Sequence, residues 1–559
     1  MAGLTQRLSL YLRTVRWLRL TQLGWFIYRR VRGVINPPAV PAETSRDAVA
    51  ATAFVSTPQP DHAELRFLNV SAPADPAAID WHPADKSRLW RYNLHYFDFL
   101  QWDVLPAEFK PAYIDSWLAA NPVGCEDAWE PYTVSLRIVN WIKYCNTLTE
   151  VPAAWQDSLT NQANWLAHNL EHHILANHYY KNAKALVFAG VWLDGDLGQR
   201  LLRQGTHMFL QETAEQILAD GGHYERAPMY HCIVLEDLLD VLNLMQAHPA
   251  LFGDADSARV HDVALRAARW LDEVSTADGR IPLFNDSAHG IAPPVSVLLD
   301  YAERAAGYER LAPPRQPARV AQPDSGYFGY RHENDSLLID CGRIGPGYQP
   351  GHTHCDMLSY ELYVDGKPLI IDAGVHGYEG DDTRAYLRST AAHNTVVFED
   401  AEQSEIWGTF RVARRAEPLR PQLSQIEDGH LRFTGAHNGY ERLPQKVVHN
   451  RQIDAELGRA WEITDQLAGQ GTGTAESFVH FAPGIDLEQG DDGTVSVLRA
   501  GRRIARVTVY EGCAQRVEEG YVAPQFGLRE AAPVLVLQRS GGLPLRLGYR
   551  IERIPPEMA

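Results

Sequence analysis

Hydrophobic residues between about Trp81 and Ala306 recur at intervals of three and four positions, and short polar loops interrupt them. This spacing places the apolar side chains on one face of each helix, as is typical of stacked antiparallel helices. The clearest helical segments are residues 134–147, 158–173, 180–193 and 232–245. No fixed-length repeat relates them, and polar and aromatic residues gather in loops and at helix starts. The pattern predicts an incomplete (α/α) toroid over residues 66–312, built around a cleft.

The pattern changes after a cluster of prolines at residues 313–323. From there on, short runs of β-branched and aromatic residues alternate with turn signals such as Asp365-Gly366. Such runs predict strands, and the lack of helical segments between them favours antiparallel pairing. We therefore predict a multidomain α+β protein whose C-terminal part, residues 313–559, is an antiparallel β-sandwich.

Residues 1–65 follow neither pattern. Seven arginines and no acidic residue occur before Glu43, interleaved with Leu, Trp, Phe and Tyr. This composition predicts one basic amphipathic helix at residues 3–33 and a Pro- and Ala-rich linker at 34–65. The helix lacks the apolar stretch of a secretory signal or of a membrane span. We expect it to make peripheral contact with an anionic membrane or to dock on the toroid by its aromatic face. A cytoplasmic or membrane-peripheral location is favoured over a periplasmic one.

Composition narrows the classes of function. The 559 residues are 45% hydrophobic and 22% charged, which is ordinary for a globular protein but too long for one hydrophobic core. The formal net charge of −18 argues against a nucleic-acid partner and requires any site for an acidic polymer to be local. The six cysteines are scattered without a CxxC pair, so they indicate neither a disulfide scaffold nor a cysteine-rich zinc site.

Two polar clusters lie in the helical part. Asn177 and His178 precede an apolar helix, where a helix cap and a solvent-facing histidine are the simpler explanation. A second segment spans residues 220–231, and its polar members include Glu225, Arg226, Tyr230 and His231. A core tyrosine with a satisfied hydroxyl would explain Tyr230. Taken alone, neither cluster identifies a reaction.

Two further clusters lie in the β region. They are GHTHCDMLSYELYVDGKPLIIDAG at residues 351–374 and RSTAAHNTV at residues 388–396. Alternate residues of a strand share a face, so we expect His352, His354 and Asp356 to point the same way. Neighbouring strands would bring Asp372 and His393 close to them. Two imidazoles and a carboxylate form a zinc-type ligand set, and a packing role without metal is the alternative.

The order of these four clusters resembles the heparinase II/III family and the related alginate and oligoalginate lyases. The resemblance covers most of the chain from about residue 90, and its most specific part is the 351–374 segment followed by His-Asn-Thr-Val. It implies a helical toroid and a sandwich that close on a cleft holding a uronic-acid polysaccharide. It therefore implies a polysaccharide lyase whose partner is an acidic polysaccharide.

The resemblance also assigns roles to single residues. Asn177 matches the donor that neutralises the uronate carboxylate, His178 its neighbouring active-site histidine, and Tyr230 the catalytic tyrosine. His352 matches a β-domain histidine that reaches into the cleft. The remaining matches imply a structural zinc rather than a catalytic one, with the ligands His354, Asp372 and His393.

These residue types suit β-elimination. The C5 proton of a uronate becomes acidic when charge building on its carboxylate is stabilised, which an amide and a histidine can do. Tyr230 is then the predicted general acid for the leaving O4, with His178 or His352 as base if the two groups lie on opposite ring faces. A tyrosine base would need nearby cations, because its ordinary pKa is about 10. The predicted substrate contacts are Arg137, Glu225, Arg226, His231 and Trp129.

Two alternatives remain open. A glycoside hydrolase on the same scaffold needs two carboxylates about 5–9.5 Å apart, for which Glu225, Asp220 and Asp286 are the candidates. A weakly catalytic polysaccharide-binding protein of a glycan assembly system would suit the arginine-rich helix, although the combined amide, histidine and tyrosine count against it. The polymer fits a bacterial exopolysaccharide, capsule or lipopolysaccharide glycan as well as a glycosaminoglycan.

Overall fold

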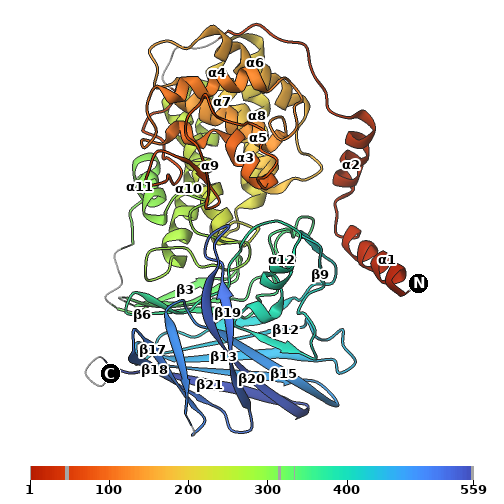
Figure 1. The fold of residues 1–559 in the computed structure, drawn as a ribbon, viewed down its shortest axis with the longest axis vertical. Helices are drawn as coiled ribbons and strands as arrows, with labels where there is room; N and C mark the ends of the chain where they lie inside the picture. Colours follow the sequence, from red (N-terminus) through yellow and green to blue (C-terminus); the bar gives the residue numbers. More distant parts are fainter. Residues whose placement is uncertain (1, 44–48, 312–315, 333, 491, 556–559) are drawn as a thin grey trace.

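The computed structural model describes residues 2–43, 49–311, 316–332, 334–490 and 492–555. Helices fill the N-terminal part and antiparallel sheets the C-terminal part, and the two parts stack one on the other (Figure 1). The predicted α+β class is confirmed. The predicted boundary at residues 312 and 313 lies outside the described residues, as does part of the predicted linker, at 44–48.

Helices α3 to α11 make up the helical part. Their bounds are α3 (Arg88–Tyr96), α4 (Phe109–Ala120), α5 (Pro131–Cys145), α6 (Ala153–His168), α7 (Ala176–Trp192), α8 (Gly195–Gln216), α9 (Pro228–Ala247), α10 (Asp254–Val274) and α11 (Val295–Ala306), with 3-10 turns η1 (Asp98–Gln101) and η2 (Pro249–Leu251). Helix α7 packs against α5, α8 and α9, while α10 packs against α9 and α11. Because α7 and α9 are buried along nearly their whole length, they form the centre of this part.

The β part contains three larger sheets. The five-stranded sheet has the order β3-β4-β5-β6-β7, the eight-stranded sheet β11-β12-β13-β14-β21-β18-β17-β16, and the four-stranded sheet β19-β20-β15-β8. Their bounds are β3 (Ala318–Gln322), β4 (Tyr327–His332), β5 (Asp335–Asp340), β6 (Tyr360–Val364), β7 (Lys367–Ile370), β8 (Val396–Phe398), β11 (Pro418–Leu423), β12 (His430–His437), β13 (Val448–Glu456), β14 (Ala460–Ala468), β15 (Thr472–His480), β16 (Ile485–Gln489), β17 (Thr494–Arg499), β18 (Arg502–Val509), β19 (Ala514–Val522), β20 (Glu530–Gly542) and β21 (Leu545–Arg553).

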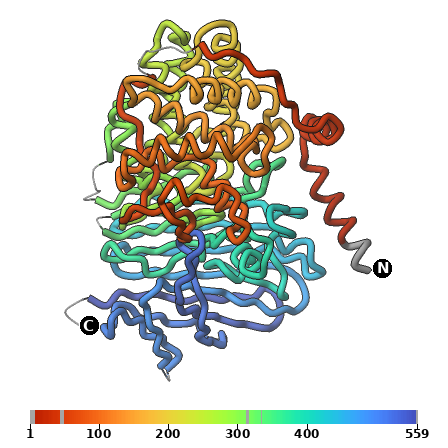
Figure 2. The backbone as a smooth tube through the Cα atoms, turned by 45° about the horizontal axis from the view of Figure 1, so that its top comes forward, coloured from red at the N-terminus to blue at the C-terminus, as the bar shows by residue number. Residues whose placement is uncertain are grey.

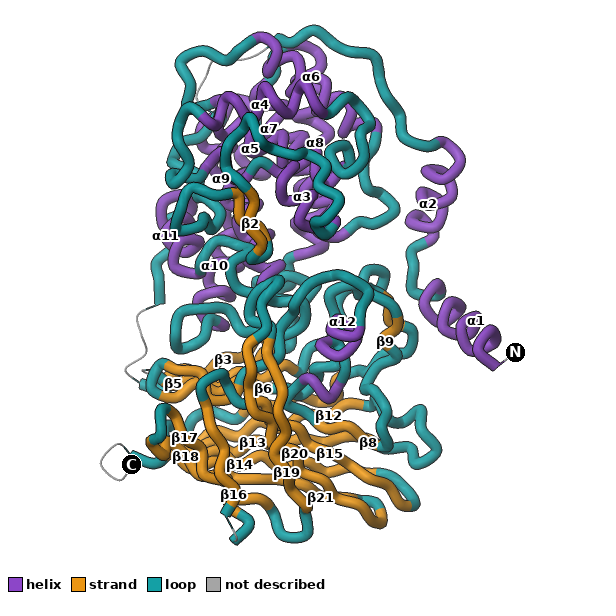
Figure 3. Tube along the Cα trace, viewed as in Figure 1, coloured by secondary structure: helices purple, strands orange, loops and turns teal. Residues whose placement is uncertain are grey.

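The sheets pack face to face. Strand β13 alternates buried and half-buried residues along its length, which is the pattern of a strand with one face in a core. One hydrophobic cluster contains Ile339 of β5, Ile453 of β13 and Leu535 of β20, so the three sheets share a core. Short pairs complete the described strands: β1 (Leu65–Phe67) with β2 (Val70–Ala72), and β9 (Ile406–Trp407) with β10 (Arg411–Val412). Figure 3 shows the separation of helices from strands.

The arginine-rich segment differs from its prediction. Instead of one helix, it contains α1 (Ala2–Val15) and α2 (Leu20–Arg32), which lie at the side of the molecule (Figures 1 and 2). Helix α2 docks on the helical part, with the Trp25 ring stacked 4.2 Å from that of His172. Helix α1 docks on the β part, where Tyr11 meets the ring of Trp407 at 4.7 Å. The predicted docking on the toroid therefore holds for α2 but not for α1.

The segment predicted as a linker also packs on the helical part. Within its described residues, Val49 and Val55 are buried in the helical core. The backbone amide of Val49 donates to the side chain of Asn146 at 2.9 Å, and that of Ala51 donates to Asn243 at 2.8 Å. None of the described helices is long and apolar enough to cross a membrane.

Candidate functional site

A cavity of about 770 Å³ lies where the helical part meets loops of the β part. Asn177 and His178 reach its wall from the first turn of α7, and Tyr230 from the first turn of α9. His352 and Tyr378 reach it from loops of the β part. The structure thus brings the four residues predicted as catalytic into one cavity and adds a second tyrosine.

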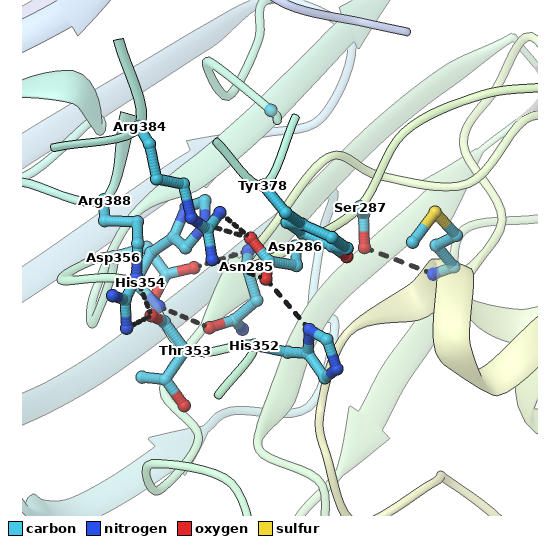
Figure 4. Close-up of polar contacts among 12 residues, drawn as sticks. Asn285, Asp286, Ser287, His352, Thr353, His354, Asp356, Tyr378, Arg384 and Arg388 are labelled. Atoms are coloured by element: carbon cyan, nitrogen blue, oxygen red, sulfur yellow. Dashed lines mark hydrogen bonds and ion pairs between the residues drawn. The ribbon is translucent and has the colours of Figure 1, made fainter. Parts of the chain in front are cut away.

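Asp286 is the centre of a polar network beside this cavity (Figure 4). It lies in the loop between α10 and α11 and is fully buried. Its carboxylate oxygens lie 2.9 Å from His352 Nδ1 and 2.7 Å from His354 Nε2, and Arg384 of helix α12 (Asp382–Leu387) donates to both. Burial opposes its charge, but Arg384 and the histidines hold the pKa of Asp286 well below its usual range.

This network fixes the orientation of His352. Because the Asp286 carboxylate is ionised and can only accept, His352 Nδ1 carries the proton in their hydrogen bond. The other nitrogen, Nε2, lies 3.5 Å from a Glu225 carboxylate oxygen. A histidine held by a carboxylate at one nitrogen presents the other as a proton acceptor, which is the arrangement of a general base.

Tyr230 packs directly against this histidine. The two rings are stacked with centroids 3.9 Å apart, and the Tyr230 hydroxyl lies 2.9 Å from that of Tyr378. Burial, together with the neighbouring hydroxyls of Tyr378 and Tyr132, raises the pKa of Tyr230 well above its usual value. Tyr230 is therefore a neutral phenol that can donate a proton, and its surroundings disfavour the phenolate that a tyrosine base requires.

Asn177 is held by Glu225 at the start of α7. The two residues before it, Leu175 and Ala176, have left-handed backbone angles, with φ of 64° and 53°. The backbone N–H of Asn177 donates to Glu225 at 3.1 Å, and its Nδ2 donates to both carboxylate oxygens at 3.0 and 3.2 Å. Glu225, a predicted substrate contact, is buried, caps the start of α7 and does not line the cavity.

His178, which is half-buried, forms an ion pair with the buried Glu171. Its Nδ1 lies 3.0 Å from Glu171, in the turn between α6 and α7, and its ring lies 4.4 Å from that of Tyr132. Burial opposes both charges, but the attraction between them raises the pKa of His178 and lowers that of Glu171. A protonated His178 beside Asn177 places a positive charge in the cavity wall, where it could meet a substrate carboxylate.

The structure places Arg137, a predicted substrate contact, away from the cavity. Arg137 is fully buried on the inner side of α5, donates to Gln162 at 2.8 Å, and its guanidinium lies 4.1 Å from the ring of Trp117. Trp129, which packs on Trp165, is likewise a core residue and does not line the cavity. The helical periodicity around Arg137 does not show that this charged side chain has its partners inside the core.

His231 and Arg226 are also placed away from the cavity. His231 is buried with Nε2 3.0 Å from the backbone oxygen of Ala267. The Arg226 guanidinium donates to the backbone oxygens of Tyr224 and Asp324 at 3.1 and 3.0 Å. Both side chains join segments of the fold and neither lines the cavity, so their substrate contacts remain predictions.

A group of paired charges that sequence reasoning missed lies in another part of the cavity wall. Lys143 and Lys184 lie 2.7 and 2.6 Å from Asp240, while Lys181 and Lys184 lie 2.6 and 2.8 Å from Asp237. Burial opposes the charge on Asp240, but the two lysines lower its pKa to about 2. Glu236 lies 3.5 Å from Lys143, so the three lysines that line the cavity face three carboxylates.

The predicted zinc ligands lie close together, but not on a strand. Residues 351–359 form a loop, and β6 begins only at Tyr360, so shared strand geometry does not orient them. The rings of His354 and His393 lie 5.3 Å apart, and Asp372 accepts from His393 Nδ1 at 2.9 Å. His354 Nδ1 and His393 Nε2 are buried without a hydrogen-bond partner among the described residues.

These two nitrogens fit a cation, because buried polar atoms are normally satisfied and metal-binding histidines commonly bond a carboxylate at their other nitrogen. The described residues do not contain a group of three side chains placed to hold a metal ion. In this arrangement Asp372 orients His393 through its Nδ1, and the zinc ligand set implied by the resemblance stays a prediction.

The carboxylates proposed for a hydrolase are engaged elsewhere. Asp286 is enclosed by Arg384 and the histidines, and Glu225 caps α7. Asp220 accepts from the backbone amides of Gly222 and Ser325 at 3.0 and 2.7 Å. None of the three carboxylates lines the cavity, so the hydrolase alternative loses its candidates.

Comparison with known proteins gives the family. The description "Heparinase II/III N-terminus" matches residues 43–301, and "Heparinase II/III-like, C-terminal" matches residues 314–541. The chain belongs to the heparinase II/III family. The two matched regions coincide with the helical part and the β part, so both halves of the cavity wall come from family domains.

Relatives in this family are distant. A heparin-sulfate lyase of Bacteroides stercoris is 22% identical over 426 residues, which cover 70% of this chain and 60% of that protein. FtsZ-localized protein C of Caulobacter vibrioides is 23% identical, covering 70% of this chain and 67% of that protein. A crystal structure of heparinase III superposes with a TM-score of 0.65 at 16% identity, covering 96% of this chain and 89% of that one. The chain spans less than two thirds of the Bacteroides stercoris lyase.

Proposed function

We propose that this member of the heparinase II/III family is a polysaccharide lyase that cleaves a uronic-acid-containing polysaccharide by β-elimination. The observation that carries the proposal is the single cavity in which Asn177, His178, Tyr230 and His352 meet. The name heparin-sulfate lyase, borne by distant relatives, supports the same reaction class.

In the proposed reaction, protonated His178 and the amide of Asn177 stabilise negative charge on the uronate carboxylate. Nε2 of His352 then takes the C5 proton. The electron pair of the broken C5–H bond forms the C4–C5 double bond as the C4–O4 bond breaks. Tyr230 donates its phenolic proton to the departing O4. Asp286 stabilises the imidazolium that forms on His352.

In this reaction the substrate carboxylate and Glu225 would share the amide of Asn177 as hydrogen-bond donor. The Asn177 amide already donates to Glu225, so a substrate carboxylate must compete with that side chain for Nδ2. We propose that His178 makes the stronger contact with the carboxylate, since it carries the charge. If Glu225 kept Asn177 from substrate, the chain would act as a polysaccharide-binding protein, the second candidate function.

The assay measures far-ultraviolet absorbance during incubation with uronate polymers. The release of reducing ends is measured in parallel. The panel contains glycosaminoglycans, alginate and acidic bacterial exopolysaccharide, capsule and lipopolysaccharide glycans. A lyase raises both signals, because elimination leaves a conjugated double bond on the new non-reducing end. Reducing ends without absorbance would show hydrolysis, and a polymer that is bound without either signal would show the binding protein.

The ion pair of His178 predicts a pH dependence. Its pKa is raised, so the imidazolium persists to higher pH than in an ordinary histidine and is lost as pH rises through that pKa. The carboxylates that face it are Glu171, Glu225 and Glu130. We expect kcat/KM to fall on the alkaline side, and Glu171→Gln to move that fall to lower pH by removing the largest attraction. An alkaline limb that does not move would remove His178 from charge stabilisation.

We propose further that zinc binds at His354 and His393, with Asp372 orienting His393. Bound zinc would order the loops beside the cavity and would supply no step of the reaction. We expect purified protein to contain zinc by elemental analysis, and a chelator to lower its melting temperature. His393→Ala should lower zinc content and remove the effect of chelator, whereas His449→Ala, a buried histidine of β13, should keep the zinc. Protein that is free of zinc yet equally stable with chelator would overturn the proposal.

A further inference from the structure

Helices α1 and α2, which we call the arm, carry most of the exposed large hydrophobic side chains of the described residues. Ten of the sixteen exposed large hydrophobic side chains in the described part of the chain lie between residues 8 and 31. On each helix a row of them shares one face, at spacings of three, four or seven residues. These rows are Leu8, Leu12 and Val15 on α1, and Leu20, Ile27 and Val31 on α2.

The arm is anchored to the body by other side chains. Gln22 is buried and donates to the backbone oxygen of Ile174, and Trp17 donates to that of Ala413. Trp25 stacks on His172. The exposed rows are therefore not needed to hold the arm in place, and Leu20 and Val31 remain 85% and 83% exposed.

The charge of the arm contrasts with that of the body. Residues 1–42 contain seven arginines and no acidic residue, which gives them a formal charge of +7. Since the whole chain carries −18, the remaining residues carry −25. Arg7, Arg16 and Arg30 are exposed and form no ion pair with any described residue. An acidic body is repelled by an anionic surface, whereas this arm is attracted to one.

We propose that the arm binds the surface of an anionic lipid membrane. Apolar rows flanked by arginines fit the boundary between phospholipid headgroups and acyl chains, where helices lie parallel to the surface. A second copy of the chain offers a poorer partner, because the other exposed large hydrophobic residues among those described are scattered between residues 34 and 410.

The test is sedimentation of the full chain with vesicles, without any polysaccharide, so that it is independent of the lyase proposal. We expect binding to vesicles that mix phosphatidylcholine with phosphatidylglycerol, none to phosphatidylcholine alone, and a decrease with added salt. Ile27→Asp with Val31→Asp should weaken binding by at least about tenfold, since it removes apolar contact and adds repulsion. Val123→Asp with Leu251→Asp changes charge equally at exposed sites outside the arm and should leave binding unchanged.

Three results would overturn the proposal. They are no binding to anionic vesicles, equal binding to both kinds of vesicle, and an equal loss in the Val123 and Leu251 control. A dimer in sedimentation equilibrium that Ile27→Asp with Val31→Asp dissociates, without lipid binding, would assign the face to a second copy instead. Circular dichroism of each variant checks that the fold is retained.

Discussion

Replacing Tyr230 with phenylalanine is expected to lower kcat by about 10²–10⁴-fold while leaving KM nearly unchanged. The substitution removes only the hydroxyl, so the ring keeps its stacking on His352 at 3.9 Å. Without the phenolic proton, the departing O4 must leave as an alkoxide, which raises the barrier of the elimination. Steady-state kinetics by ultraviolet absorbance on the cleaved polymer measures both constants.

A matched control exists within the same loop and helix region. Tyr224 is also buried and its hydroxyl lies 2.9 Å from that of another tyrosine, Tyr348, but it does not line the cavity. Tyr224→Phe removes an equivalent tyrosine–tyrosine hydrogen bond and should leave kcat unchanged. Tyr378→Phe, which removes the partner of Tyr230, should lower kcat by only about tenfold. Equal losses in Tyr230→Phe and Tyr224→Phe would mean that the hydroxyl acts through stability alone.

Much of the fold could be predicted because periodicity records which face of each element is buried. The predicted segment 232–245 falls within α9, and 134–147 overlaps α5 but runs two residues past its end at Cys145. Both helices begin earlier than predicted, at Pro131 and Pro228. Proline suits the first helical position, because an N–H there would form no hydrogen bond within the helix. The sequence therefore contains a signal for both helix starts. The break between α1 and α2 was not, because the amphipathic pattern continues across it.

The site could be predicted only in part, because motifs identify residues but not their partners. The segment around His352 marked that histidine, yet it sits on a loop and takes its orientation from Asp286, 66 positions earlier in the chain. Asp286 had entered only as a carboxylate for hydrolysis, and Tyr378 lay in no recognised pattern. Arg137 shows the opposite case, because this charged side chain of an apolar helix has its partners in the core and no sequence pattern reveals them.

Breaking the buried ion pair of Asp286 and Arg384 is expected to cause a large loss of stability. Asp286→Asn is expected to destabilise the protein by about 3–5 kcal/mol, because it leaves a buried guanidinium without its counter-charge. Both side chains are buried, and water cannot replace the lost carboxylate oxygen. Urea unfolding followed by circular dichroism measures the change in free energy of unfolding.

Asp454→Asn is the matched control, because it breaks an aspartate–arginine pair with Arg432 at an exposed position and should cost less than about 1 kcal/mol. Activity separates two roles of Asp286, measured under conditions in which the variant is folded. Since the amide can no longer stabilise the imidazolium on His352, kcat should also fall by about 10²–10⁴-fold. A destabilised variant that retains full kcat would show that Asp286 holds the fold together but does not position the base, and the proton acceptor would then have to be sought elsewhere in the cavity.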